Sequence, residues 1–150
     1  MSLEPFAGVL EGREHVLPVR VYYEDTDFTG VVYHASYVRF FERGRTDFLR
    51  LAGVHHAELL AAEEPAAFTV VRLEVDYHRP ARIDDALLVR TVYEAVKGPR
   101  LIIGQRIVRG EEPIATAQVT AACIDLAGRP RKPPRWMRER LAPLISRDLP

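Results

Sequence analysis

The stretch ASYVRFFERGRTDFLRLA, residues 35–52, decides the fold of this 150-residue chain. Its apolar side chains recur at spacings of three and four residues, which is typical of a helix with one buried face. Gly53 ends the pattern where a left-handed cap is common. Gly44 lowers helix propensity in mid-helix, so we expect the helix to pass close to a sheet there. On the polar side, the spacing of Arg43 and Asp47 predicts an ion pair across one turn. The apolar stripe consists of Tyr37, Phe40, Phe41, Gly44, Phe48, Leu51 and Ala52.

Strand-like segments flank this helix on both sides. Apolar and β-branched residues alternate in them, and a short helical or irregular piece at residues 55–64 interrupts the series. Tight-turn residues at 98–99 and 110–113 predict antiparallel hairpins between the later segments. A final helix is expected from about residue 136 to residue 145. The predicted strands are residues 16–23, 68–78, 86–96, 101–109 and 114–125.

The order of these elements predicts the architecture. One strand comes first, then the long helix, then four consecutive strands. A helix with an apolar stripe must bury it, and a meander of strands offers an apolar face. We therefore expect an α+β hotdog fold, in which a curved antiparallel sheet wraps around one long central helix.

Composition narrows the classes of protein to consider. The chain is 47% hydrophobic and 28% charged, as in an ordinary globular protein. Lys+Arg and Asp+Glu both number 21, so overall charge gives no support for a nucleic-acid partner. The single cysteine, Cys123, excludes an intrachain disulfide and is expected to serve packing. We expect a cytoplasmic protein, because no run reaches the roughly 18 apolar residues of a membrane span and residues 1–12 do not resemble a secretory signal.

The segment before the helix is the most specific part of the sequence. Residues 22–37 read YYEDTDFTGVVYHASY. They resemble the 4-hydroxybenzoyl-CoA thioesterase-like hotdog family, in particular the branch associated with the bacterial Tol-Pal system. Residues 75–85, VDYHRPARIDD, resemble a later strand and turn of that family. The resemblance leaves residues 1–15 as an N-terminal leader before a single domain at 16–150. The matching residues are Asp25, Thr26, Asp27, Gly30, Val31, Val32, Tyr33, His34, Tyr37, Glu42 and Arg45.

The resemblance implies an acyl-CoA thioesterase with Asp27 as its catalytic carboxylate. It also implies that the start of the helix presents an amide to the thioester carbonyl, and that active sites form between two subunits. Thioester hydrolysis needs a nucleophile or activated water and donors for the oxyanion. No serine lies in a nucleophile elbow, so carboxylate chemistry is expected. Asp27 would attack directly or deprotonate a water, and the backbone amide of His34 is the candidate oxyanion donor.

Each of these acidic and imidazole groups also has a plainer interpretation. Asp27 can be a turn aspartate that satisfies local amides. Asp25 fits a structural hydrogen-bonding role better than a catalytic one. Glu42 is the candidate if the carboxylate comes from the long helix, as in some hotdog thioesterases, but it also fits a salt bridge. The ring of His34 fits equally well a role in the site and contact with solvent.

The remaining candidate residues concern substrate binding. Aromatic side chains near the helix start are expected to line the acyl pocket, and arginines suit the phosphates of coenzyme A. We expect no metal site, because His55, His56 and Glu58 lack a further ligand. No cofactor is expected, since coenzyme A is part of the substrate. The substrate-binding candidates are Gly30, Tyr33, Tyr37, Arg79 and Arg82, with Phe28 and Thr29 beside them and a weaker basic cluster at 129–135.

The functional prediction is hydrolysis of small or medium acyl-CoA. Two alternatives stay open: a hotdog dehydratase or hydratase, and an acyl-carrier-binding or scaffold module of envelope or lipid synthesis. Acyl-carrier protein is a possible partner. A homodimer or homotetramer is expected, because a single hotdog sheet leaves an edge strand and one face of the site open.

Overall fold

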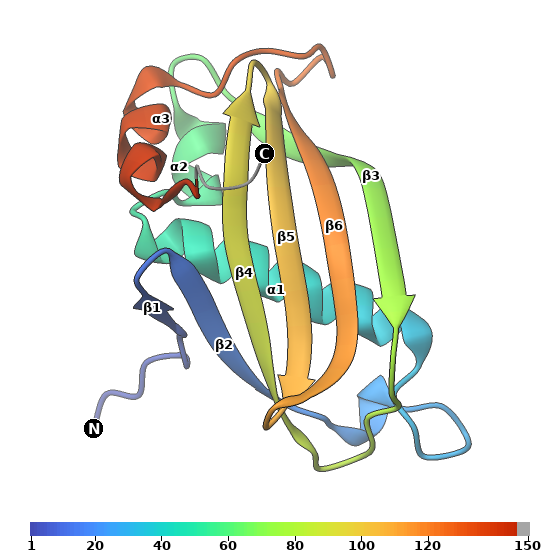
Figure 1. Ribbon diagram of the computed structural model, residues 1–150. Helices are drawn as coiled ribbons and strands as arrows, with labels where there is room; N and C mark the ends of the chain where they lie inside the picture. The colour runs from blue at the N-terminus through green and yellow to red at the C-terminus, as the bar shows by residue number, and fades with distance from the viewer. Residues whose placement is uncertain (147–150) are drawn as a thin grey trace.

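Six antiparallel strands form one curved sheet in the computed structural model, which describes residues 1–146 (Figure 1). Their spatial order is β1-β2-β4-β5-β6-β3, so β1 and β3 form the two edges. Consecutive pairing of β4, β5 and β6 confirms the predicted hairpins. The strands are β1 (Val9–Glu11), β2 (Glu14–Arg20), β3 (Ala67–Tyr77), β4 (Ala86–Lys97), β5 (Arg100–Arg109) and β6 (Glu112–Ile124).

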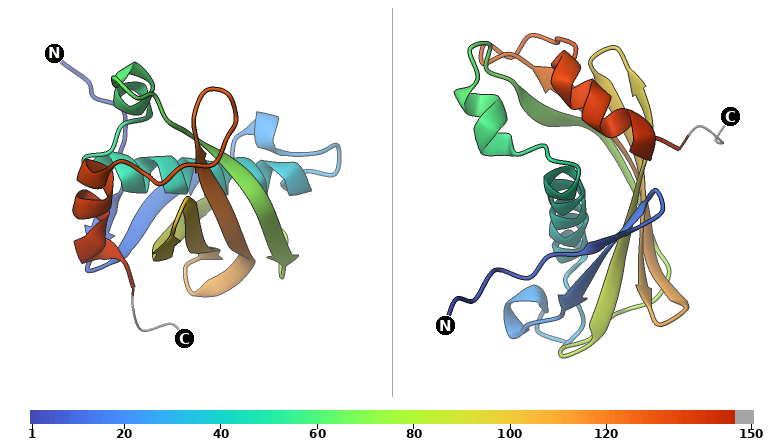
Figure 2. Two further views of the ribbon diagram at one scale, coloured as in Figure 1. Left: turned by 90° about the horizontal axis from the view of Figure 1, so that it is seen from above. Right: turned by 90° about the vertical axis from the view of Figure 1, so that its left-hand side faces the viewer.

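The long helix α1 (His34–Leu51) lies in the concave face of this sheet (Figure 2). A Cβ atom on Gly44 would lie 2.8 Å from Thr91 Oγ1 and 2.9 Å from Val89 Cγ1 of β4, which confirms the predicted close approach. Leu51 was expected in the buried stripe, but it is 41% exposed because Val54 and Leu59 fill the core at this end. The α+β hotdog architecture is therefore confirmed. The buried side chains of α1 include Tyr37, Phe40, Phe41, Phe48 and Leu49.

Two shorter helices cover one end of the sheet, α2 (His56–Ala61) and α3 (Arg135–Leu141). The last helix ends earlier than predicted, because Pro143 cannot continue it, and a 3-10 turn (Ala142–Leu144) follows. Within residues 1–146, no helix combines the length and apolar character that crossing a bilayer requires.

The N-terminal segment packs against the domain more than expected. β1 pairs with β2, and the buried His15 places Nε2 2.7 Å from Asp47 Oδ2 on α1. The backbone N–H of Gly8 donates to the same oxygen at 2.8 Å. The predicted pair between Arg43 and Asp47 is therefore wrong, because Asp47 turns toward the hairpin. The predicted boundary between an N-terminal leader at 1–15 and the domain at 16–150 stays a prediction. Residues 8–15 nevertheless contact the sheet and α1.

Candidate active site

The turn before α1 is held in place by Asp25. Its buried carboxylate accepts the backbone N–H of Tyr22 at 2.8 Å. Its carbonyl oxygen accepts the backbone N–H of Tyr33 at 2.9 Å and the hydroxyl of Ser36 at 3.0 Å. These bonds tie the 3-10 turn at Tyr23–Asp25 to the start of the helix. Asp25 therefore has the structural role that its position suggested.

Asp27 lies in a tight loop two residues further on. Its Oδ1 accepts the backbone N–H of Thr29 at 2.7 Å and the Thr29 hydroxyl at 2.6 Å. The loop closes through a bond from the Asp27 N–H to the Val31 carbonyl and through Gly30, whose φ of 85° favours glycine. Oδ2 accepts no hydrogen bond from residues 1–146. The turn-aspartate interpretation therefore describes one carboxylate oxygen, and the other is open to solvent or substrate.

The charge state of Asp27 follows from these contacts. The Thr29 hydroxyl, and then the Thr29 backbone amide, lower the pKa of the Asp27 carboxyl below its ordinary value, because both donors favour the ionised form. The group is therefore a carboxylate at neutral pH. An ionised carboxylate in an exposed loop can act on an electrophilic carbonyl or orient a water.

The start of α1 supplies unpaired amides near this loop. Asp27 lies in a short hairpin closed by the bridge between Thr26 and Val32, and His34 begins α1 two residues after that bridge. In the described part of the chain, the backbone N–H groups of His34 and Ala35 have no hydrogen-bond acceptor, as is usual for a first helical turn. The His34 ring is exposed, and its centroid lies 4.5 Å from that of the Tyr33 ring, with the two planes tilted by 50°. The predicted oxyanion donor is thus available to a ligand.

A cavity of about 290 Å³ lies against this helix start. Tyr77, at the end of β3, donates its hydroxyl to the His34 carbonyl at 3.0 Å and packs 5.6 Å from the Tyr37 ring. The buried Tyr37 accepts the Ala81 N–H at 3.0 Å. These contacts bring together residues 22–37 and 75–85, the two stretches that resemble the family. The cavity is lined by Val32, His34, Tyr37, Tyr77, His78, Arg79 and Pro80.

The two candidate phosphate ligands, Arg79 and Arg82, differ in their contacts. Arg79 lines the cavity, and its Nε lies 3.6 Å from an oxygen of Glu112. Arg82 pairs through its backbone with Val31, in the loop of Asp27. Its exposed side chain forms no ion pair within residues 1–146. Among the described residues, the guanidinium of Arg82 therefore has no carboxylate partner, whereas that of Arg79 lies near one.

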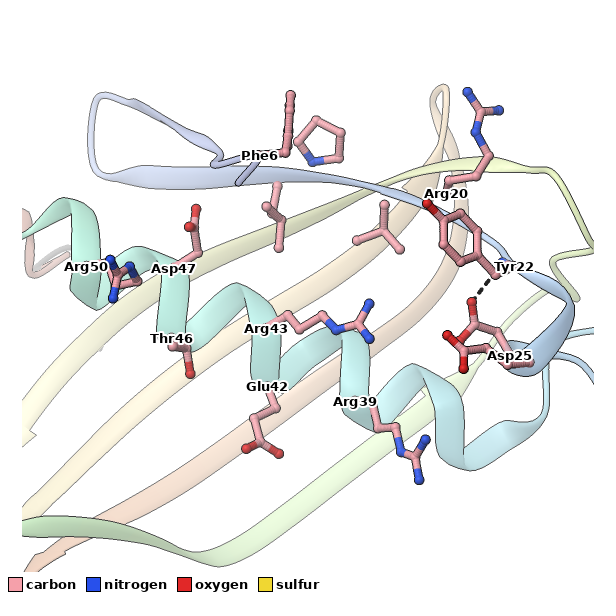
Figure 3. Close-up of a pocket in the computed structure, with 14 residues that line it drawn as sticks. Phe6, Arg20, Tyr22, Asp25, Arg39, Glu42, Arg43, Thr46, Asp47 and Arg50 are labelled. Carbon is pink, nitrogen blue, oxygen red and sulfur yellow. Dashed lines mark hydrogen bonds between the residues drawn. The ribbon is translucent and has the colours of Figure 1, made fainter. Parts of the chain in front are cut away.

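Glu42 does not join this cluster. It lies on α1 more than two turns after His34 and is exposed. It lines the groove between α1 and β2, where Figure 3 shows its carboxylate turned away from Asp25. It also lines a second cavity between α1 and β3. Tyr77, which the sequence analysis did not single out, contacts the helix start instead, and its place inside the stretch 75–85 was the available signal.

Comparisons with known proteins agree with this architecture. The thioesterase-like superfamily matches residues 21–141. The acyl-CoA thioester hydrolase YbgC of Escherichia coli is 47% identical over 120 residues, 79% of this chain and 88% of that protein. The acyl-CoA thioesterase YbgC of Haemophilus influenzae is 48% identical over 109 residues, 73% of this chain and 79% of its own.

A solved structure, a probable thioesterase from Bartonella henselae, superposes with a TM-score of 0.78 at 42% identity. The match covers 81% of this chain and 99% of that one. The family match spans the loop of Asp27, the whole of α1 and strands β3 to β6. This chain therefore belongs to the thioesterase-like superfamily of hotdog proteins.

Proposed function

We propose that this chain hydrolyses small or medium acyl-CoA thioesters, with Asp27 as the catalytic carboxylate. Thioester hydrolase activity is supported by the YbgC relatives at 47% and 48% identity. The observation that carries the assignment of Asp27 is its open Oδ2 in the hairpin that leads into α1, whose first amides, those of His34 and Ala35, have no acceptor within residues 1–146. The cavity of about 290 Å³ beside them suits an acyl group of modest size.

The proposed chemistry uses groups that the fold holds in place. The thioester oxygen lies against the amides at the start of α1, where the helix dipole favours developing negative charge. In one route Asp27 attacks the carbonyl carbon, the C–S bond breaks, and water then hydrolyses the resulting mixed anhydride. In the other route Asp27 takes a proton from the water that attacks the carbonyl carbon. In both routes water supplies the proton with which coenzyme A leaves as the thiol. No cofactor takes part. Incorporation of ¹⁸O from labelled water into Asp27 during a single turnover would demonstrate direct attack, followed by hydrolysis of the anhydride at the Asp27 carbonyl.

Coenzyme A would place its phosphates near Arg82 and Arg79. This follows from the uncommitted guanidinium of Arg82 next to the loop of Asp27 and from the suitability of guanidinium groups for phosphate. The test compares thiol release from acyl-CoA, acyl-pantetheine and acyl-carrier protein with the same acyl group. We expect the highest kcat/KM with acyl-CoA. Equal kcat/KM values for acyl-CoA and acyl-pantetheine would contradict a role for the phosphates. Turnover of the acyl-carrier-protein thioester alone would show that acyl-carrier protein, and not coenzyme A, carries the substrate.

We further propose that two copies associate through β3. This edge strand is unpaired on one side within residues 1–146, and it exposes Val70, Val71, Leu73 and Tyr77 by 37–48%. Such an edge is a template for pairing with another chain. Antiparallel pairing centred on Leu73 would place Arg72 opposite Glu74 of the second copy, whereas pairing centred on Glu74 would place Glu74 opposite itself.

This register would also bring the second copy to the active site. Thr69 of the second copy would lie opposite Tyr77, which contacts the helix start. The proposal predicts a dimer, or a tetramer of such dimers, in sedimentation at micromolar concentration. Arg72→Glu should weaken the dimer, and the double variant Arg72→Glu/Glu74→Arg should restore it. A monomeric wild type, or a double variant weaker than the single one, would contradict the pairing.

A further inference from the structure

A second cavity, of about 300 Å³, lies between α1 and the first half of β3. Half of its lining residues are apolar, and these come from α1 and from strands β3, β5 and β6. One strong cation, Arg45 of α1, lines it. An apolar cavity with a single guanidinium is an unusual environment, because a charge removed from water is costly unless it is paired. The apolar wall includes Leu49, Phe68, Leu101, Ile103 and Ala121.

Arg45 has few partners inside the protein. Its Nη1 donates to Gln105 Oε1 at 3.0 Å. No carboxylate of residues 1–146 lies within 4.0 Å of its guanidinium. Removal from water lowers the pKa of Arg45, but a guanidinium stays charged and carries five donors. Several donors of Arg45 are therefore available to a ligand in the cavity.

Other partly buried arginines of the chain show the contrast. Arg90 lies 2.6 Å from an oxygen of Glu14, and Arg109 lies 2.6 Å from an oxygen of Asp85. Each of them is paired by a carboxylate that the fold supplies. Arg45 is more deeply placed, and its side-chain hydrogen bond goes to the neutral amide of Gln105, which also donates to the Phe41 carbonyl at 2.8 Å. Within residues 1–146, the Glu42 carboxylate acts on Arg45 electrostatically but forms no ion pair with it, so a bound anion would be the first direct charged partner of Arg45.

Apolar residues of β3 lie between this cavity and the proposed active site. Tyr77 contacts the His34 ring at 6.4 Å between centroids, and Val75 and Leu73 follow on the same face of β3 by the two-residue period of a strand. Further toward the N-terminal end of β3, past a bulge between Arg72 and Val70, residues 68–70 line the second cavity. Along α1, His34 and Arg45 are separated by a rise of about 16 Å. An acyl chain held at the helix start can therefore extend along β3 toward Arg45.

We propose that Arg45 binds the far end of the acyl group, so that acyl chains ending in a carboxylate are preferred over those ending in a methyl group. This inference rests on the thioesterase function proposed above. A terminal carboxylate would form charge-assisted hydrogen bonds with the guanidinium, and the apolar wall would bury the methylene chain. Three other titratable groups line the cavity: Glu42, which is exposed and lies one helical turn before Arg45, His56, whose pKa burial lowers, and the buried Tyr93.

The test measures kcat/KM for suberyl-CoA and octanoyl-CoA, which have acyl chains of equal length and differ in one terminal carboxylate. The quantity compared is the ratio of the two values within one protein sample. This ratio does not depend on the concentration of folded enzyme. Dodecanedioyl-CoA and dodecanoyl-CoA repeat the comparison for a longer chain. We expect the wild type to favour the diacid thioester at one or both lengths.

Arg45→Met removes the charge and should lower this ratio by at least about tenfold, since a charged hydrogen bond contributes about 1.5–3 kcal/mol. Arg45→Lys should keep part of the preference. Arg43→Met is the matched control, because Arg43 lines the groove on the other side of α1 and should leave the ratio unchanged (Figure 3). A wild type that favours the methyl-ended thioesters at both lengths, or a ratio equal in wild type and Arg45→Met, would overturn the proposal even if one variant folds poorly. No thiol release from any acyl-CoA would overturn the thioesterase function instead.

Discussion

Replacement of Gly44 by alanine should destabilise the protein, although alanine is the better helix former. Alanine contributes about 0.8–1.0 kcal/mol of helix propensity relative to glycine. Its Cβ, however, would lie 2.8 Å from Thr91 Oγ1 and 2.9 Å from Val89 Cγ1. Both neighbours are β-branched residues of a central strand, so they cannot move away easily. Overpacking of this kind costs about 1–3 kcal/mol, and we expect a net loss of about 1 kcal/mol.

For a domain of this size that loss corresponds to a fall in Tm of about 2–4 °C. Thermal unfolding followed by circular dichroism measures it. Val89→Ala removes one of the two crowding atoms, so the double variant Gly44→Ala/Val89→Ala should be more stable than the sum of the single effects predicts. A Tm that rises in Gly44→Ala, as propensity alone would give, would refute the close packing of α1 on β4. So would strict additivity in the double-mutant cycle.

Two further predictions concern the active site. Thr29→Val removes the hydroxyl that most strongly lowers the pKa of Asp27, so that pKa should rise and the acid limb of the kcat/KM profile should move to higher pH; an unshifted limb would show that another group titrates. Dialysis against a chelator should leave thiol release unchanged, because the proposed chemistry uses a carboxylate and backbone amides alone; activity that is lost on dialysis and restored by a divalent metal would contradict it.

The parts of the fold that local chemistry specifies were predictable from sequence. The period of apolar residues located α1 within one residue at each end, and Gly98 and Gly110 marked turns that need positive φ. The contact of His15 with Asp47 was not predictable, because it joins residues 32 positions apart through the β1–β2 hairpin. Arg43 and Asp47 have the spacing of a helical ion pair, but Asp47 instead contacts His15.

The candidate site likewise combines features that the sequence predicted with features that depend on the packed fold. The resemblance singled out Asp27, whereas residue chemistry alone favoured a turn aspartate, and the structure contains the contacts of such an aspartate on Oδ1. The contact of Tyr77 with the helix start depends on where β3 ends relative to α1, which spacing along the chain does not specify. The unpaired state of Arg45 depends on no carboxylate of residues 1–146 lying within 4.0 Å of its guanidinium, so only the packed fold reveals it.

The most direct test of the central claim compares thiol release by the wild type, Asp27→Asn and Asp125→Asn on one acyl-CoA that the wild type hydrolyses. Asp125 is a matched control, because its Oδ1 likewise accepts backbone N–H groups within its own turn, from Ala127 and Arg129. We predict that Asp27→Asn loses at least about 10²-fold in kcat with an unchanged circular dichroism spectrum, and that Asp125→Asn keeps wild-type kinetics. Full activity in a folded Asp27→Asn would contradict the account.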